Sequence, residues 1–163
     1  MRPEDLGALL TAAGVEYRPG EVRRLLAHVI ARDLPGFPEA RPIPRRLEKI
    51  IAERFARAPL DLVERVADPT DGFEKFLFRS PDGALSEAVR IPLEKPGHYS
   101  VCLSSQVGCA MACDFCATGR LGWTRDLEAW EMVAAFLGVR RLSDGRPTGA
   151  VFMGQGEPLA NAD

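Results

Sequence analysis

The sequence predicts an α/β protein with three parts: a small helical domain (residues 1–60), a short β-strand segment (61–97) and the start of a parallel sheet (98–163). Three observations predict this order. Helical apolar spacing marks the first part, short alternating runs mark the second, and a strand–loop–helix–strand pattern marks the third. One such unit cannot bury both faces of a parallel sheet. We therefore expect the chain to be the N-terminal part of a longer protein, or a truncated gene product.

The helical part begins with two segments, residues 4–14 and 19–33, separated by a glycine and a proline. In the second segment the apolar residues recur at helical intervals: Val22, Leu25, Leu26, Val29 and Ile30. A proline-rich connection, residues 33–44, leads to a third predicted helix, residues 45–56. These helices would form one small domain.

The middle part contains three partly alternating runs, residues 61–68, 73–80 and 86–93. They are separated by "PTDG" and "SPDGA", in which the Asp-Gly pairs are turn signals. This pattern predicts strands joined by tight turns.

The last part begins near Tyr99 with a predicted strand, residues 99–104, and a cysteine-rich loop. A helix at about residues 126–138 and an apolar strand, residues 148–154, follow. A strand, helix and strand in this order form a βαβ unit, so we expect the two strands to be parallel.

Overall charge gives no reason to expect nucleic-acid binding, because the formal net charge is -2. Basic residues nevertheless gather in the helical part: Arg23, Arg24, Arg41, Arg45, Arg46, Lys49, Arg54 and Arg57. A basic helical surface can contact phosphates. A solvated helix face balanced by nearby glutamates is the alternative.

No apolar run approaches the roughly 18 residues that predict a membrane span. The N-terminus also lacks the hydrophobic core of a secretory signal. We therefore expect a cytoplasmic protein, in which clustered thiols indicate metal binding or catalysis before disulfides.

Three of the four cysteines lie in "GCAMACDFCATG": Cys109, Cys113 and Cys116. Thiolates are soft ligands that select iron–sulfur clusters or zinc. A structural zinc site needs four ligands, usually in two separated C-x2-C pairs, and no second pair is present. Cys102 could supply a fourth ligand, but its direction is set by the predicted strand. The spacing favours an iron–sulfur cluster, with zinc and unligated thiols as the alternatives.

At these residues the sequence resembles the radical S-adenosylmethionine (SAM) enzymes, which carry C-x3-C-x-Φ-C after a first β-strand. Within them, "VCLSSQVGCAMACDFCATGRLGWTRDL" resembles the RNA adenine-C2 methyltransferases that act on 23S ribosomal RNA and transfer RNA. The same family has "MGMGEPL" after the next strand, where this chain has "FMGQGEPLAN". The match covers residues 87–161 well and the earlier strands and helices more loosely. It implies an accessory helical domain and strands leading into a partial, truncated radical SAM (β/α) barrel.

The resemblance implies that Cys109, Cys113 and Cys116 bind a [4Fe–4S] cluster whose fourth iron takes SAM, which is then cleaved to a 5′-deoxyadenosyl radical. Gly156 and Glu157 match the SAM-binding loop, in which Glu157 can pair with the methionine ammonium. Without the cysteines, these two residues would indicate only a turn after a buried strand. The resemblance also places Phe115 near the adenine, although an aromatic side chain beside such a loop is usually core.

Two further residues have roles implied by the resemblance. Cys102 would work with a methyl-carrying cysteine from the C-terminal region, resolving the covalent RNA adduct through a transient disulfide. The alternative for Cys102 is an inert buried thiol. Glu87 would be a proton acceptor, and its alternative is a polar residue on the outer face of a strand. Arg90 replaces a residue that is usually uncharged in the family.

The function implied by the resemblance is methylation of C2 of adenosine in 23S ribosomal RNA, transfer RNA or both. In the family, the methyl-carrying cysteine that works with Cys102 lies in a C-terminal region that this sequence does not include, so we expect the chain to be inactive by itself. The implied partners are RNA and an electron donor such as flavodoxin, and we expect a monomer. The rival hypotheses are a radical SAM paralogue with another product, such as C8 methylation, and a non-catalytic RNA-binding relic with a structural metal.

Overall fold

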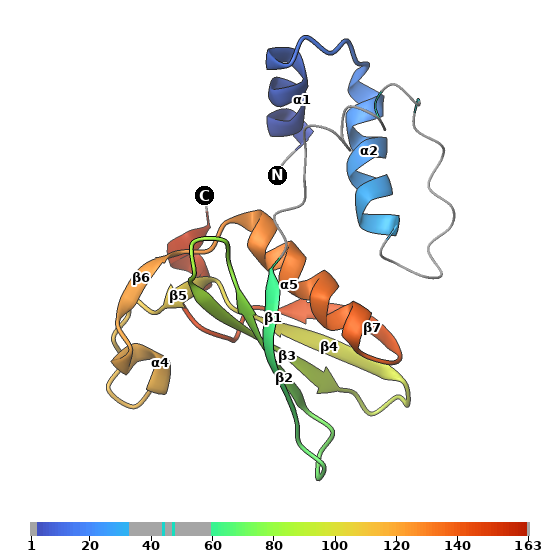
Figure 1. The fold of residues 1–163 in the computed structure, drawn as a ribbon. Coiled ribbons are helices and arrows are strands. Elements are labelled where there is room, and N and C mark those ends of the chain that lie inside the picture. Colours follow the sequence, from blue (N-terminus) through green and yellow to red (C-terminus); the bar gives the residue numbers. More distant parts are fainter. Residues whose placement is uncertain (1–2, 33–43, 45–46, 48–59, 163) are drawn as a thin grey trace. The chain divides into compact units, whose positions relative to one another are not determined.

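A computed structural model describes residues 3–32, 44, 47 and 60–162 (Figure 1). The chain divides into two compact units, residues 1–57 and residues 58–163. Among the described residues, no helix is both long enough and apolar enough to cross a membrane.

The first unit contains helix α1 (Pro3–Ala12) and helix α2 (Pro19–Arg32), at nearly the predicted positions. Proline is favoured in the first turn of a helix, because its missing N–H has no helical partner there in any case. The side chain of Glu21 then accepts a hydrogen bond from the backbone N–H of Arg18 at 2.8 Å. These two residue choices explain why α2 begins where it does.

The two helices pack through apolar side chains one turn apart on each helix. Leu6 and Leu10 of α1 contact Val22 and Leu25 of α2, and none of the four is more than 4% exposed. This contact is the described core of the first unit. The predicted third helix, residues 45–56, lies outside the described residues except for Leu47, which is buried.

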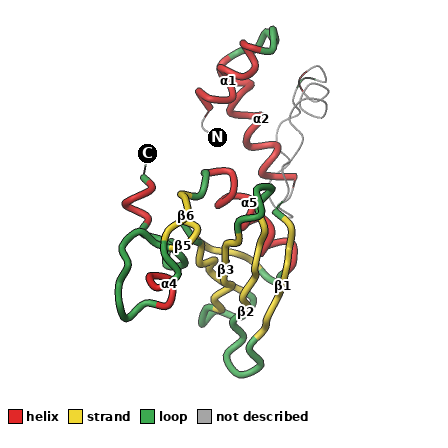
Figure 2. Tube along the Cα trace, turned by 60° about the vertical axis from the view of Figure 1, so that its left-hand side comes forward, coloured by secondary structure: helices red, strands yellow, loops and turns green. Residues whose placement is uncertain are grey.

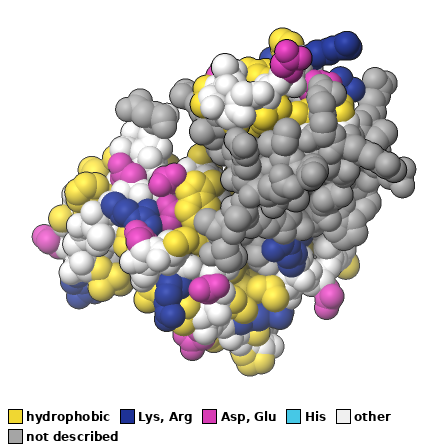
Figure 3. Space-filling model, turned by 45° about the horizontal axis from the view of Figure 1, so that its top comes forward, with side chains coloured by type: hydrophobic (Ala, Val, Ile, Leu, Met, Phe, Trp, Pro, Cys, Tyr) yellow, Lys and Arg dark blue, Asp and Glu magenta, His cyan; other side chains and the backbone are white. Residues whose placement is uncertain are grey.

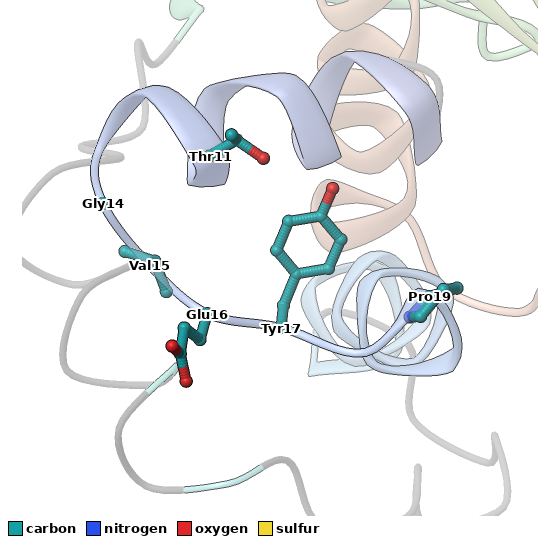
Figure 4. A pocket seen from close by; sticks show the side chains of 6 residues that line it. All are labelled: Thr11, Gly14, Val15, Glu16, Tyr17 and Pro19. Carbon is teal, nitrogen blue, oxygen red and sulfur yellow. The ribbon is translucent and has the colours of Figure 1, made fainter.

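The connection between α1 and α2 borders a shallow hollow, shown in Figure 4, which is lined by Thr11, Gly14, Val15, Glu16, Tyr17 and Pro19. The ring of Tyr17 points from the connection toward α1. A Cβ atom at Gly7 would lie 2.7 Å from the Tyr17 hydroxyl, so the glycine leaves room for the ring. Tyr17 thus lines the hollow and packs against α1 at Gly7.

The second unit is built on a five-stranded sheet with the order β1-β2-β3-β4-β7. The strands are β1 (Asp61–Ala67), β2 (Glu74–Arg79), β3 (Leu85–Pro92), β4 (His98–Leu103) and β7 (Arg146–Val151). The first four are antiparallel neighbours, and β7 pairs with β4 in parallel. The predicted parallel pair is therefore confirmed. The antiparallel strands belong to the same sheet, and the predicted division at residue 97 stays a prediction.

The turns between these strands use the predicted Asp-Gly pairs. Gly72 and Gly83 have φ angles of 74° and 88°, which are accessible to glycine and strained for other residues. The side chains of Asp71 and Asp82 accept hydrogen bonds from the backbone N–H two residues on. Each turn is thus fixed by its own side chain.

One face of the sheet is covered by helix α5 (Ala129–Leu142), as Figure 1 shows. The core between them consists of Phe76, Phe78, Ala88, Tyr99, Val101, Leu103, Ala135 and Val139. Side chains alternate between the two faces of a strand, so the intervening residues of β2, β3 and β4 point away from α5.

A second, two-stranded antiparallel sheet follows β4. It contains β5 (Gln106–Gly108) and β6 (Trp123–Asp126), and the short helix α4 (Ala117–Arg120) lies between them in sequence. Figure 2 shows β5, β6 and α4 grouped at one end of the unit. The sequence did not predict this sheet.

Two predicted boundaries were displaced. Helix α5 was expected from about residue 126 but begins at Ala129, because the preceding residues pair in β6. Glu128 and Glu131 form a capping box at this start. Strand β7 was expected to reach residue 154 but ends at Val151. Beyond it, the N–H of Gly154 turns to the carbonyl of Leu103 at 3.1 Å.

Candidate active site

The cysteine loop, residues 109–116, runs from the end of β5 to the start of α4. Its three thiols, on Cys109, Cys113 and Cys116, are free and half-buried. The N–H of Cys109 donates to the carbonyl of Gly122 at 2.9 Å, and the N–H of Cys116 donates to the carbonyl of Cys113 at 3.0 Å. Backbone hydrogen bonds therefore hold both ends of the loop.

A close backbone approach sets the path of this loop. A Cβ atom at Gly119 would lie 2.6 Å from the carbonyl oxygen of Cys113 and 2.7 Å from its nitrogen. Ala112 adopts a φ angle of 48°, which is uncommon for a residue with a side chain. Small residues at both positions let α4 fold back against the loop.

The environment of Cys116 favours the thiolate. The backbone N–H of Gly119, and then that of Thr118, hydrogen bond to its sulfur and lower the pKa of the thiol below its ordinary value. Arg120 adds a smaller effect of the same sign. The thiolate is the form of cysteine that binds a metal.

The chemistry of this donor set fits a soft metal centre, since three free thiols share one loop. Within residues 3–32 and 60–162, however, no three Cys, His, Asp or Glu side chains converge closely enough to hold a metal ion. The thiols would have to turn toward one another to bind a cluster. The donors fit the predicted [4Fe–4S] site, and its geometry stays a prediction.

A second loop, residues 154–157, follows β7 and lies against the segment that follows β4. The N–H of Ser105 donates to the carbonyl of Gln155 at 2.8 Å, and the N–H of Gln155 donates to the hydroxyl of Ser104 at 3.1 Å. The carboxyl ends of parallel strands are where α/β folds bind ligands. The Glu157 loop follows β7 directly, and the cysteine loop follows β4 by way of β5, so both come after the carboxyl ends of this parallel pair.

Gly156 and Glu157 lie at the contact between the two loops. Gly156 has a φ angle of 97°, and a Cβ atom there would lie 2.6 Å from the Cβ of Gln106. Only glycine allows the second loop to approach this closely. The carboxylate of Glu157 accepts a hydrogen bond from the N–H of Leu159 at 3.0 Å. It thereby caps the 3-10 helix η1 (Pro158–Asn161).

Gln106 joins the two loops, and the sequence reasoning missed it. Its side-chain oxygen accepts hydrogen bonds from the N–H of Glu157 at 3.1 Å and the N–H of Ala110 at 3.4 Å. Its side-chain nitrogen donates to Asp126 Oδ1 at 2.8 Å. The signal that could have found it is the polar run Ser-Ser-Gln directly after an apolar strand. All three of these residues are buried.

Asn161 fixes the far end of the second loop and was also missed. Its side-chain nitrogen donates to the carbonyl of Ser105 at 2.7 Å and to the carbonyl of Leu127 at 2.8 Å. One side chain thus ties η1 to the segment after β4 and to the residue after β6.

Glu87 and Cys102, the two predicted catalytic residues, lie on the same face of the main sheet. Cys102 is opposite Val89 in the β3–β4 register, and Glu87 is two residues from Val89. Ala88, which lies between Glu87 and Val89 in the sequence, packs on the other face under α5. Glu87 and Cys102 are therefore diagonal neighbours on the face away from α5.

Cys102 is buried, with 8% of its surface exposed, and its thiol is free. Burial raises the pKa of this thiol, and a hydrogen bond involving the backbone of Met153 offsets the rise only in part. The thiol is therefore protonated near neutral pH. It lies on β4, apart from the loop that contains the other three cysteines.

Glu87 forms an ion pair with Lys75, whose Nζ lies 3.1 Å from Glu87 Oε1. The hydroxyl of Ser104 also donates to the backbone carbonyl of Glu87 at 2.7 Å. Arg90, three residues on, projects to the opposite face, where its guanidinium lies 4.9 Å from the centre of the Tyr99 ring. Arg90 and Glu87 therefore point to opposite faces of β3.

Phe115 is 90% exposed, and its predicted contact with adenine stays a prediction. The predicted RNA-binding residues after Arg24 lie outside the described residues. On the face seen in Figure 3, basic and acidic side chains are interspersed.

No protein-family model matches the chain. A probable RNA methyltransferase of Sorangium cellulosum is 47% identical over the whole chain, which covers 42% of that protein. A probable dual-specificity RNA methyltransferase RlmN 1 of Opitutus terrae is 42% identical over 98% of the chain, which covers 45% of that protein. A crystal structure of a radical SAM methyltransferase from Sphaerobacter thermophilus matches with a TM-score of 0.73 and 34% identity. The match covers 99% of this chain and 47% of that one. The chain thus spans less than half the length of these relatives.

Proposed function

Since the chain belongs to the family of radical SAM RNA methyltransferases, we propose that it supplies the cluster-binding and SAM-binding loops of an enzyme that methylates C2 of adenosine in 23S ribosomal RNA, transfer RNA or both. One observation supports this most strongly. The loop with three free thiols and the loop with Glu157 hydrogen bond to the same buried segment at the carboxyl ends of β4 and β7.

The cysteine loop would hold the [4Fe–4S] cluster through Cys109, Cys113 and Cys116. A cluster bound there supplies the electron that cleaves SAM. Glu157 would hold the ammonium group of SAM, since an ionised carboxylate binds an ammonium by charge-assisted hydrogen bonds. Its present partner, the N–H of Leu159, shows that this carboxylate can accept hydrogen bonds.

The face of the sheet away from α5 would receive the adenine. C2 of adenine is not nucleophilic, so direct transfer of a methyl group from SAM fails there, whereas a radical route through a methyl-cysteine does not need a nucleophilic carbon. On this face Glu87 would accept a proton from the adduct, and Lys75 holds its carboxylate in place. Cys102 would resolve the adduct by attacking the sulfur of the methyl-carrying cysteine. A disulfide forms between the two cysteines, the carbon–sulfur bond of the adduct breaks, and the released carbon takes up the proton of the Cys102 thiol.

In the family that the sequence resembles, the methyl-carrying cysteine comes from the C-terminal region, and the roles proposed for the four cysteines of this sequence do not include it. We therefore propose that the chain does not complete the reaction by itself. The proposed partners are a substrate RNA and a reductant of the flavodoxin type, which would place the reaction in the cytoplasm. We further propose that the protein acts as a monomer.

The test is nucleoside analysis with a protein that joins this chain to the remaining, C-terminal part of one of its relatives. The protein is reconstituted with iron and sulfide without oxygen, reduced, and incubated with SAM and RNA. We expect cleavage of SAM and the mass and retention time of 2-methyladenosine. An 8-methyladenosine product would indicate the paralogue, and bound zinc without SAM cleavage would indicate the non-catalytic relic.

A further inference from the structure

Gln106 is 1% exposed, and both the nitrogen and the oxygen of its side-chain amide form hydrogen bonds. A buried amide oxygen has two lone pairs, and here both are used by backbone N–H groups from different loops. Ala110 belongs to the loop with the thiols, and Glu157 belongs to the loop that follows β7. One oxygen atom therefore links two segments that are separated by the whole of α5.

Asp126 determines which way this amide points. A carboxylate accepts hydrogen bonds and donates none, so the amide nitrogen of Gln106 must face Asp126 Oδ1 at 2.8 Å. The amide oxygen is thereby directed toward the two backbone N–H groups. Asp126 also accepts a longer hydrogen bond from the indole of Trp123 at 3.4 Å. Hydrogen bonds therefore connect Asp126 of β6 to Gln106, and Gln106 to both loops. We call these three bonds the Gln106 relay.

We propose that Gln106 is a positioning residue that sets the separation between the cysteine loop and the Glu157 loop, with Asp126 setting its orientation. SAM bound by Glu157 would then lie beside the metal cluster bound by the three thiols. This inference rests on the proposed function, because it assigns the second loop to SAM. Gln106 itself need not touch SAM or the metal.

Four variants separate this role from simple core packing. Gln106→Leu keeps the size of the side chain but removes the shared acceptor. Gln106→Glu keeps an acceptor but turns a second carboxylate oxygen toward Asp126. Asp126→Asn keeps an oxygen that can accept from Gln106 at the same size, so it serves as the matched control for the charge of Asp126. The double variant Gln106→Glu with Asp126→Asn reverses only the hydrogen bond between the two positions. The amide at position 126 then donates to one carboxylate oxygen at position 106, and the other oxygen still accepts from both loops.

The first readout needs no cofactor: amide hydrogen exchange of Ala110 and Glu157 in the chain as it is. We expect Gln106→Leu to speed exchange at both amides by about fivefold or more, the factor produced by losing one typical hydrogen bond. Asp126→Asn and the double variant should exchange like the wild type at both positions. Acceleration at neither amide in folded Gln106→Leu would overturn the proposal.

The second readout is binding to the anaerobically reconstituted protein. We expect the two Gln106 single variants to keep the iron content of the wild type and to bind SAM about tenfold more weakly, which corresponds to one buried hydrogen bond. The double variant should recover wild-type affinity for SAM. Unchanged affinity in folded Gln106→Leu, or no recovery in the double variant, would overturn the positioning role. If the wild type itself binds neither iron nor SAM, the proposed function fails, and the exchange experiment still decides the role of Gln106.

Discussion

Among single residues, the four cysteines occupy two kinds of environment. Cys102 lies buried on β4, where burial raises the pKa of its thiol. The other three lie half-exposed on one loop, and hydrogen bonds from the backbone lower the pKa of Cys116. Burial thus separates one protected thiol from three accessible ones. The thiolate is the reactive and metal-binding form, and the lowered pKa favours it at Cys116.

We expect iodoacetamide to modify Cys102 more slowly than the three loop cysteines in the metal-free chain near pH 7. Two causes act in the same direction, because burial excludes the reagent and also keeps the thiol protonated. Raising the pH should speed modification of Cys102 until the pH passes the raised pKa of its thiol, so its rate should level off at a higher pH than that of an ordinary thiol. Peptide mass mapping over time measures all four rates, and urea should abolish the difference. Modification of Cys102 as fast as Cys109 in the folded chain would contradict this assignment.

Among the elements, the cysteine loop is positioned by its neighbours more than by its own side chains. The start of the loop is held by the β5–β6 pairing, and its end is held where α4 approaches Cys113. Strand β6 is in turn tied to the start of α5 and to the β2–β3 turn by Arg125. These contacts lead to two predictions, one for the loop and one for the strand.

We expect Gly119→Ala to destabilise the second unit by about 1–3 kcal/mol, the usual cost of overpacking. The new methyl group would overlap backbone atoms of Cys113, which cannot move as a flexible side chain can. Iron binding after reconstitution should fall as well. Gly149→Ala is the matched control, because a Cβ atom there meets only the hydroxyl of Ser100 at 4.0 Å. Urea unfolding measures both variants, and equal stabilities would refute the role of Gly119.

Glu131 is the buried centre of the contact that holds β6. Arg125 donates two hydrogen bonds to its carboxylate at 2.8 and 2.9 Å, and Ser80 donates a third. Burial alone would raise the pKa of Glu131, but these hydrogen bonds outweigh burial and hold the pKa below its ordinary value. The ionised form is therefore the one that stabilises the fold.

We expect Glu131→Ala to cost about 3 kcal/mol, near the lower end for breaking a buried ion pair, because Arg125 stays partly exposed. The depressed pKa means that the contribution of the carboxylate is present above the pKa of the unfolded chain. It is lost as the pH falls through the lower pKa of the folded chain. Acid should therefore destabilise the wild type more steeply than the variant.

The control is Asp82→Asn, at the exposed end of the same contact, which should unfold in urea like the wild type. An equal loss of unfolding free energy in both variants would contradict a buried centre at Glu131.

For the whole molecule, periodicity predicted most of the second unit, and contacts distant in sequence determined the rest. The strands and α5 have local apolar patterns, so their existence was predictable. Strand β5 has three residues, too few for an alternating pattern, and β6 displaced the predicted start of α5. The relay through Gln106 joins residues separated by up to 51 positions, and no local pattern encodes such a hydrogen bond.

The candidate site was predictable where ligand chemistry restricts residue type and spacing. Three clustered thiols indicate a metal from their spacing alone, and the family resemblance supplied Gly156 and Glu157. The shared face of Glu87 and Cys102 follows from a strand register that only the fold determines. The buried Ser-Ser-Gln run was visible as a pattern, but its partners were not.

The proposed RNA contact belongs to the scale of the whole molecule, and its residues lie outside the described ones. We expect reversing Arg45, Arg46 and Lys49 to Glu in the whole protein to weaken RNA binding, because each can contact a phosphate. The slope of log affinity against log salt concentration should also become less negative. The change should be roughly 0.7 for each phosphate of a single-stranded segment that the variant no longer neutralises. Binding titrations at several salt concentrations measure both effects, with Lys95→Glu as a control for a single charge reversal at an exposed position of the second unit. Unchanged affinity and slope in the triple variant would favour a solvated helix face.

The most direct test is the iron and sulfide content of the anaerobically reconstituted protein and of its four single cysteine-to-alanine variants. We expect about four irons and four sulfides per wild-type chain, as a [4Fe–4S] cluster requires. Alanine at Cys109, Cys113 or Cys116 should abolish this binding, whereas Cys102→Ala should retain it, because that thiol is buried on β4. Stoichiometric zinc without iron–sulfur absorbance, or loss of the cluster in Cys102→Ala, would contradict a three-cysteine radical SAM site.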